Sequence, residues 1–186
     1  MSLDNLVDAE EQSSPLLCLP HQCEFLSDTW LQRAREYLAQ AVAQRGASLP
    51  PFTIFERFAN APAHLGFEGN IAQWSASFDG DQLVVSREQI AAPDVLVEGD
   101  YQAGLYMAQV VGALAPEVMG KALRELQHWF GQGALRSQGQ LQDAGTARLV
   151  ALFHDHMARM TVENPDIYHR ARALGVERHV REVEEN

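Results

Sequence analysis

The feature of the sequence that most constrains its fold is a pair of extended segments joined by a tight turn. Residues 71–78 and 83–86 are rich in aromatic, β-branched and other apolar side chains, and Asp79-Gly80 lies between them. Glycine readily adopts the positive φ that a tight turn requires, so we expect the two segments to pair as a hairpin. An isolated hairpin is marginally stable, so further strands or helices must pack against this one.

Three more strands are predicted on either side of the hairpin. Residues 52–58 precede it, residues 94–98 follow it, and residues 134–141 form a last extended segment between glycines. All three are bounded by residues that favour turns. Because several strands follow one another instead of alternating with helices, the order predicts an α+β fold and argues against a doubly wound parallel sheet.

Helices are predicted around these strands from apolar residues at helical spacing. Ser, Asp and Asn favour helix N-termini because their side chains accept hydrogen bonds from free backbone amides, and proline fits the first turn. The predicted helices begin near Ser27, Asp100, Pro116, Thr146 and Pro165, and glycines 46, 131 and 175 end three of them.

Length and composition indicate one soluble domain with extensions. The chain has 186 residues, of which 46% are hydrophobic and 21% charged. Domains commonly contain about 100–200 residues, which leaves little room for a second core. No segment approaches the roughly 18 consecutive apolar residues that a membrane-spanning helix needs.

The charge of the chain excludes some partners. A formal net charge of −11 opposes nucleic acid and anionic lipid surfaces, so we expect neither nucleic-acid binding nor a stable membrane anchor. The acidic N-terminus lacks the basic residues of a secretory or transit signal, which predicts a cytoplasmic location. Cys18 and Cys23 have neither redox nor zinc spacing, so we expect ordinary thiols, no metal and no cofactor.

Catalytic signatures are absent from the sequence. There is no GxSxG serine motif and no HExxH zinc motif, and the glycine-rich segments fail the nucleotide-binding patterns. The cluster His154-Asp155-His156 contains two metal-binding side chains, but on a helix its two histidines point about 200° apart. We therefore predict no catalytic residue and no metal site, and we expect His156 to be a buried histidine with a hydrogen-bond partner.

Five segments occur in an order that resembles a known family. They are residues 25–30, 74–80, 84–87, 92–95 and 133–141, which read FLSDTW, WSASFDG, VVSR, APDV and GALRSQGQL. Each segment is short, and it is their common order that carries the resemblance. The chain resembles the sterol-carrier-protein-like domain family over about residues 25–141.

The resemblance implies a particular fold and function. It implies a mainly antiparallel sheet of five strands packed with helices, and an apolar tunnel between them that holds a lipid, fatty acyl chain or sterol-like molecule. The domain organisation that follows is an acidic arm at residues 1–22, a sterol-carrier-like domain at residues 23–142 and a C-terminal helical extension at residues 143–186. The sequence departs from compact members of the family at residues 67–70, at the long helix of residues 116–130 and in the segment after Leu141.

Ligand-binding residues are expected among large apolar side chains, because such groups line most ligand cavities. The same side chains would also serve as ordinary core. Arg57, Arg87 and Arg136 are candidates to bind a ligand carboxylate, or else are surface cations paired with acids. The predicted ligand-binding residues are Trp74, Phe78, Leu105, Leu123, Leu126, Trp129 and Phe130.

Two alternative functions remain open. An enzyme that acts on a small apolar substrate in a cone-shaped α+β pocket is favoured if a buried carboxylate, or His156, opens into a pocket. An interaction module, whose C-terminal helices pair with a second copy of the chain or with a partner chain, is favoured if Leu149, Phe153 and Met160 form an exposed stripe.

Overall fold

The computed structural model describes residues 22–45, 49–112 and 116–163. Apart from Gln22, the acidic arm lies outside these residues, as do Cys18 and the helix predicted after Asn164. The proposed division into an arm, a domain and an extension therefore stays a prediction.

Five strands form the main sheet, in the order β4-β3-β2-β5-β6. Neighbouring strands are antiparallel except for β2 and β5, which are parallel. The fold is thus α+β with a mostly antiparallel sheet, as predicted. The strands are β2 (Phe52–Ala59), β3 (Ala72–Phe78), β4 (Leu83–Ser86), β5 (Val95–Asp100) and β6 (Leu135–Gly139).

The predicted hairpin is formed by β3 and β4. Phe78 is paired with Leu83 in the ladder. The Asp79 carboxylate accepts hydrogen bonds from the backbone amides of Asp81 and Gln82 at 2.9 and 2.8 Å. Gly80 has φ +104°, a value that few residues with a side chain adopt. The turn chemistry therefore accounts for the position of the hairpin.

The described residues form four α-helices, and the predicted caps of two are confirmed. Ser27 Oγ accepts from the Trp30 amide at 3.2 Å, and Asp100 accepts from the Gln102 amide at 2.9 Å. Asp143 caps the helix predicted from Thr146 onward, because its carboxylate accepts from the Thr146 amide. The helices are α1 (Asp28–Arg45), α2 (Tyr101–Gln109), α3 (Pro116–Gly131) and α4 (Ala144–Met160).

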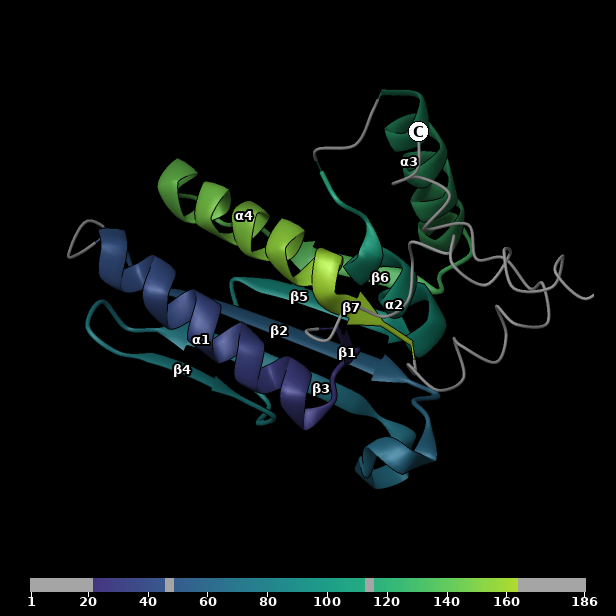
Figure 1. Ribbon diagram of the computed structural model, residues 1–186, viewed down its shortest axis with the longest axis horizontal. Helices are drawn as coiled ribbons and strands as arrows, with labels where there is room; N and C mark the ends of the chain where they lie inside the picture. The colour runs from purple at the N-terminus through teal and green to yellow at the C-terminus, as the bar shows by residue number, and fades with distance from the viewer. Residues whose placement is uncertain (1–21, 46–48, 113–115, 164–186) are drawn as a thin grey trace, which may run out of the picture.

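Helices α1 and α4 lie side by side across one face of the sheet, and α3 stands apart from both (Figure 1). The core fills the space between this helical layer and the sheet, and its largest fully buried side chains include Phe25, Phe58 and Tyr101. Trp30 on α1 donates a buried hydrogen bond to Thr161 Oγ1 at 2.8 Å. This bond joins the first helix to the segment that follows α4.

A second, two-stranded sheet joins distant parts of the chain. β1 (Cys23–Glu24) and β7 (Thr161–Val162) pair in parallel. The sequence does not predict them, because two-residue strands are too short to show an alternating pattern. They hold the start of the described chain against the end of α4.

Candidate functional site

Glu56 places a carboxylate on the helix-covered face of the central strand β2. Ile54 and Phe58, two positions away on either side, are buried on this face, and strand alternation puts Glu56 with them. Trp74 is its partner in the β2–β3 ladder. The Trp74 indole Nε1 donates to Glu56 Oε2 at 2.7 Å, so a half-buried acid is held in an otherwise apolar layer.

Aromatic rings from both covering helices pack against the tryptophan that binds Glu56. The centroid of the Trp74 ring lies 5.4 Å from that of Trp30 on α1 and 5.6 Å from that of Phe153 on α4. These are normal distances for stabilising aromatic contacts. The hydrogen-bond partner of Glu56 is therefore fixed from two sides, which fixes the orientation of the carboxylate as well.

Burial raises the pKa of Glu56 from 4.5 to about 7, and the hydrogen bond from Trp74 opposes this rise. Desolvation penalises the charged form of a carboxyl group, which explains the direction. At neutral pH the carboxyl is close to half protonated, so it can donate or accept a proton or a hydrogen bond. The enzyme alternative requires a buried carboxylate that opens into a pocket, and Glu56 is not among the residues that line the cavity on the opposite face of the sheet.

The predicted ligand-binding residues fall into two groups. Trp74, Phe78 and Leu105 are each 2% exposed and belong to the packed core. The other four lie on α3, where Leu126 and Trp129 are half-buried and pack against the core. Leu123 and Phe130 are 49% and 41% exposed. The structure thus separates three core residues from four residues of one helix, and their role in ligand binding stays a prediction.

Trp129 carries an unusual polar atom. Its indole Nε1 is buried and has no hydrogen-bond acceptor among the residues that the structure describes. Buried indole N–H groups usually find a partner, since leaving one unpaired costs about 1–3 kcal/mol. The Trp129 backbone carbonyl accepts from the Ala134 amide at 2.9 Å, which places this tryptophan where α3 leads into β6.

The three candidate arginines have different surroundings. Arg87 forms an ion pair with Asp28 at 2.8 Å, donates to the Leu26 carbonyl at 3.3 Å and lies over the Phe67 ring. It joins the start of α1 to the end of β4. Arg57 forms an ion pair with Glu98 on the face of the sheet opposite the helices, and Arg136 is exposed on β6.

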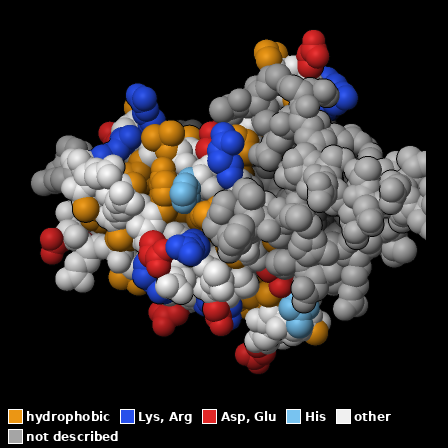
Figure 2. Space-filling model, in the orientation of Figure 1, with side chains coloured by type: hydrophobic (Ala, Val, Ile, Leu, Met, Phe, Trp, Pro, Cys, Tyr) orange, Lys and Arg blue, Asp and Glu red, His pale blue; other side chains and the backbone are white. Residues whose placement is uncertain are grey.

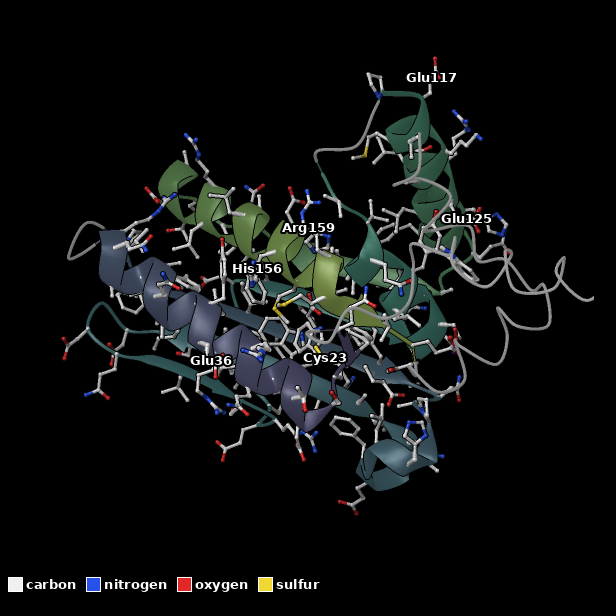
Figure 3. The ribbon with its side chains drawn as sticks, viewed as in Figure 1. Cys23, Glu36, Glu117, Glu125, His156 and Arg159 are labelled. Atoms are coloured by element: carbon white, nitrogen blue, oxygen red, sulfur yellow. The ribbon has the colours of Figure 1, made fainter. Side chains whose placement is uncertain are left out.

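The side chains of His154, Asp155 and His156 point in different directions and contact different partners, as helical geometry predicts. His154 Nε2 is 2.8 Å from the Val110 carbonyl oxygen, and Asp155 accepts from the Gly112 amide at 2.6 Å. The expectation that His156 is buried is wrong: it is exposed between α1 and α4 (Figure 3) and stacks on Tyr37 with ring centroids 4.2 Å apart. His156 directly precedes the buried Met157, so its side chain points about 100° away from that of Met157 around the helix. This rotation places His156 outside the apolar stripe.

Another buried carboxylate has a structural role. Glu24 on β1 lies 2.7 Å from His64 Nε2, in the 3₁₀-helix Ala63–Leu65. Burial raises the pKa of Glu24, and its hydrogen bond and charge interaction with His64 act in the opposite direction. This pair joins the segment after β2 to the small sheet.

The described residues contain no metal-binding cluster and no helix that could span a membrane. No group of three or more His, Cys, Asp or Glu side chains in this part of the chain is arranged to hold an ion. No helix within it is long and apolar enough to cross a bilayer. Cys23 is buried, and desolvation raises the pKa of its thiol to about 11, which keeps it protonated at neutral pH.

The exposed stripe that would favour an interaction module is absent. Leu149, Phe153 and Met160 are 1%, 5% and 8% exposed and belong to the core. Hydrophobic side chains are visible over α1 and α4 in Figure 2. Leu152 on α4 is 47% exposed. The predicted apolar face of α4 is therefore used inside the molecule.

Glu56 is the site residue that the sequence analysis missed. The segment of residues 52–58 predicted a strand, but the faces of that strand were not assigned. Phe55 is apolar and buried on the outer face, so apolar side chains occur on both faces and obscure the alternation. A lone acid inside such a segment, between Ile54 and Phe58, is the signal that could have identified it.

Solved structures with a similar fold include sterol carrier proteins, whereas no family model and no curated protein sequence matches the chain. One is sterol carrier protein 2, with a TM-score of 0.43 and 14% identity over 74% of this chain and 99% of that chain. A second is the palmitated SCP2L2 protein of Aedes aegypti, with a TM-score of 0.40 and 18% identity over 70% and 96% of the chains. The ubiquinone synthesis protein UbiJ-SCP2 has a TM-score of 0.37 and 16% identity over 66% and 85%. These solved structures carry names of the family that the sequence resembles over about residues 25–141.

Proposed function

We propose that the protein binds an apolar small molecule of the lipid class along helix α3, where this helix meets α2 and β6. The observation that carries the proposal is the incompletely covered apolar stripe of α3. Leu123, Leu126 and Phe130 recur at intervals of three and four residues and so share one side of the helix. Only Ala122 is buried among the residues of α3.

Exposure of this stripe leaves apolar surface that a ligand would remove from water. A helix of this pattern in a globular protein normally buries its apolar side, and each apolar Å² buried contributes about 25 cal/mol. Leu123 and Phe130 are instead about half exposed, and Leu126 and Trp129 are only half buried. Contacts of α3 with α2 and β6 provide a surface on which a ligand would rest.

The unpaired indole of Trp129 suggests what the ligand carries besides its apolar body. An N–H donor that is buried without an acceptor gains a partner if the ligand presents a carbonyl, carboxyl or hydroxyl oxygen. The proposed ligand is therefore an apolar molecule with an oxygen-bearing end, such as a fatty acid or a sterol.

We expect Trp129→Phe to weaken binding of a fluorescent fatty acid by about fivefold to tenfold, because it removes one hydrogen bond and keeps an aromatic ring. Leu123→Ser should weaken it as well, since it removes exposed apolar surface from the same stripe. Affinity is measured by fluorescence titration, with thermal unfolding as a check on the fold.

Leu152→Ser is the matched control, because Leu152 is a comparably exposed leucine on α4. It should leave the affinity for the fatty acid unchanged. Equal affinities in the wild type, Trp129→Phe and Leu123→Ser would refute the proposed site.

A further inference from the structure

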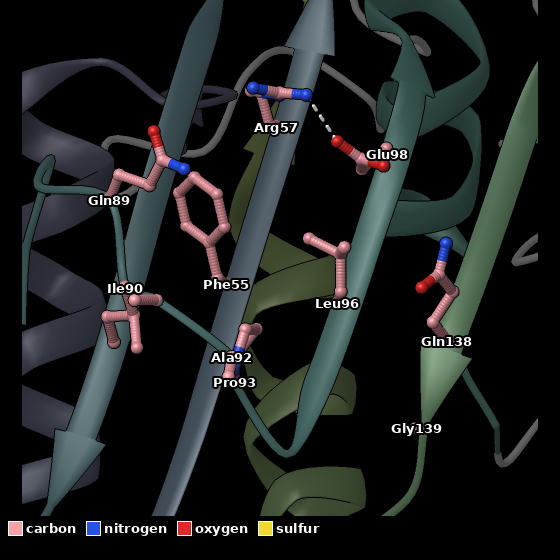
Figure 4. Close-up of a pocket in the computed structure, with 11 residues that line it drawn as sticks. Phe55, Arg57, Gln89, Ile90, Ala92, Pro93, Leu96, Glu98, Gln138 and Gly139 are labelled. Atoms are coloured by element: carbon pink, nitrogen blue, oxygen red, sulfur yellow. Dashed lines mark hydrogen bonds and ion pairs between the residues drawn. The ribbon is translucent and has the colours of Figure 1, made fainter.

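A cavity lies on the face of the sheet opposite α1 and α4. Figure 4 views this face, with the helices behind the strands. The cavity has a volume of about 370 Å³, within the range of small-ligand pockets. Its floor is formed by Phe55 on β2 and Leu96 on β5, which are neighbours in the parallel ladder.

One wall of the cavity is the connection between β4 and β5. Because β3 and β2 lie between β4 and β5 in the sheet, this connection must cross the sheet, and its residues 89–93 border the cavity. Asp94, at its end, is bound to β2: Asp94 Oδ2 accepts from Thr53 N at 2.7 Å and from Thr53 Oγ1 at 2.9 Å. The Asp94 amide donates to Thr53 Oγ1 in return. The wall is therefore held against the sheet at the point where it meets β5.

The opposite end of the cavity is charged. Arg57 on β2 and Glu98 on β5 lie side by side in the ladder and form an ion pair there (Figure 4). Arg136 on β6 is the next residue in the same row, since it is paired with Glu98 in register. The side chains of Arg57 and Glu98 are 43% and 28% exposed, so a ligand can reach both. The apolar floor of the cavity therefore ends at Glu98, which has Arg57 on one side and Arg136 on the other.

We propose that this cavity binds a small aromatic zwitterion of the size of a free aromatic amino acid. A cavity of about 370 Å³ lies in the range of small-ligand pockets and has room for one ring with two charged groups, as in phenylalanine. The ring lies on Leu96 and Phe55, the ammonium group faces Glu98, and the carboxylate faces Arg57.

Charge selects a zwitterion over a simple ion. An anion that approaches Arg57 also approaches Glu98, and a cation that approaches Glu98 also approaches Arg57, so either one meets a like charge. A zwitterion places an opposite charge beside each side chain. This second site does not depend on the proposed lipid site, because none of the α3 residues lines it.

The test is isothermal titration calorimetry, which measures the affinity of the full chain for L-phenylalanine, 3-phenylpropionate and phenethylamine. The last two keep the ring and carry only one of the two charges. We expect phenylalanine to bind about tenfold tighter than either, since loss of one charge-assisted contact costs roughly 1.4 kcal/mol. Equal affinities for the three compounds, or no heat of binding with phenylalanine, would overturn the proposal.

Three variants locate the binding site. Leu96→Trp fills the cavity and should abolish phenylalanine binding. Val84→Trp is the control, because it adds the same side chain to the same face of the sheet but on β4, outside the cavity lining. This variant should bind phenylalanine as the wild type does. Arg57→Gln should weaken binding about tenfold, because it removes the cation that faces the carboxylate. Unchanged binding in Leu96→Trp or Arg57→Gln would show that phenylalanine binds elsewhere.

Discussion

Replacing Gly99 with alanine should destabilise the fold by about 2–3 kcal/mol, the cost of inserting a methyl group where the structure has no room. A Cβ atom at this position would lie 2.1 Å from the Ala134 carbonyl oxygen, a backbone atom that cannot rotate away. That carbonyl accepts from the Asp100 amide at 2.9 Å. The substitution therefore separates the end of β5 from the entrance to β6, next to the point where α3 joins the sheet.

Urea unfolding followed by circular dichroism measures this effect, and Gly120→Ala is its matched control. Gly120 lies inside α3, and the nearest atom to an added Cβ is Arg124 Nη1 at 3.5 Å, an ordinary contact. Alanine should stabilise the helix there by about 0.5–1 kcal/mol. Opposite signs for the two substitutions are expected, and an unchanged unfolding midpoint in Gly99→Ala would contradict the β5–β6 geometry.

Glu56→Gln should make the protein more stable than the wild type at pH 8 by as much as about 3 kcal/mol. The pKa of Glu56 is about 7 in the folded protein, above the ordinary value of 4.5. Between pH 4.5 and pH 7, the Glu56 carboxyl therefore keeps its proton in the folded state but has lost it in the unfolded state. The stability due to this proton is fully present below pH 4.5 and is lost as the pH rises through 7.

The measurement is the free energy of unfolding of both proteins in urea from pH 4 to pH 8.5. Glutamine keeps an oxygen that accepts from Trp74 Nε1 and cannot ionise, so the two stability curves should meet near pH 4 and diverge above it. Trp74→Phe provides a second check, because it removes the hydrogen bond that favours the ionised carboxylate and should widen the pH dependence. Parallel curves for the wild type and Glu56→Gln would show that burial does not perturb this carboxyl.

Local chemistry explains which elements could be predicted from the sequence. The β3–β4 hairpin depends on the Asp79-Gly80 turn, and α1 and α2 begin at Ser27 and Asp100, whose side chains cap them. Each of these signals lies within a few residues of the structure that it determines. Long-range pairing leaves no such signal, which is why the parallel contact of β2 with β5 was not identified.

The candidate site was harder to predict because an apolar pattern does not distinguish core from ligand-binding surface. Trp74 and Leu123 both fit the pattern, yet Trp74 is 2% exposed and Leu123 is 49% exposed. Burial depends on which elements meet in three dimensions. The outer cavity was missed for the same reason, since Phe55, Leu96 and the connection before β5 come together only when β2 and β5 pair.

Native mass spectrometry of the purified full chain, followed by denaturing extraction, tests the proposed lipid binding most directly. We expect a mass above that of the bare chain and release of one apolar, oxygen-bearing molecule per protein, with a lower occupancy in Trp129→Phe. A bare mass that persists after incubation with fatty acid and sterol would contradict the proposal that α3 binds such a ligand.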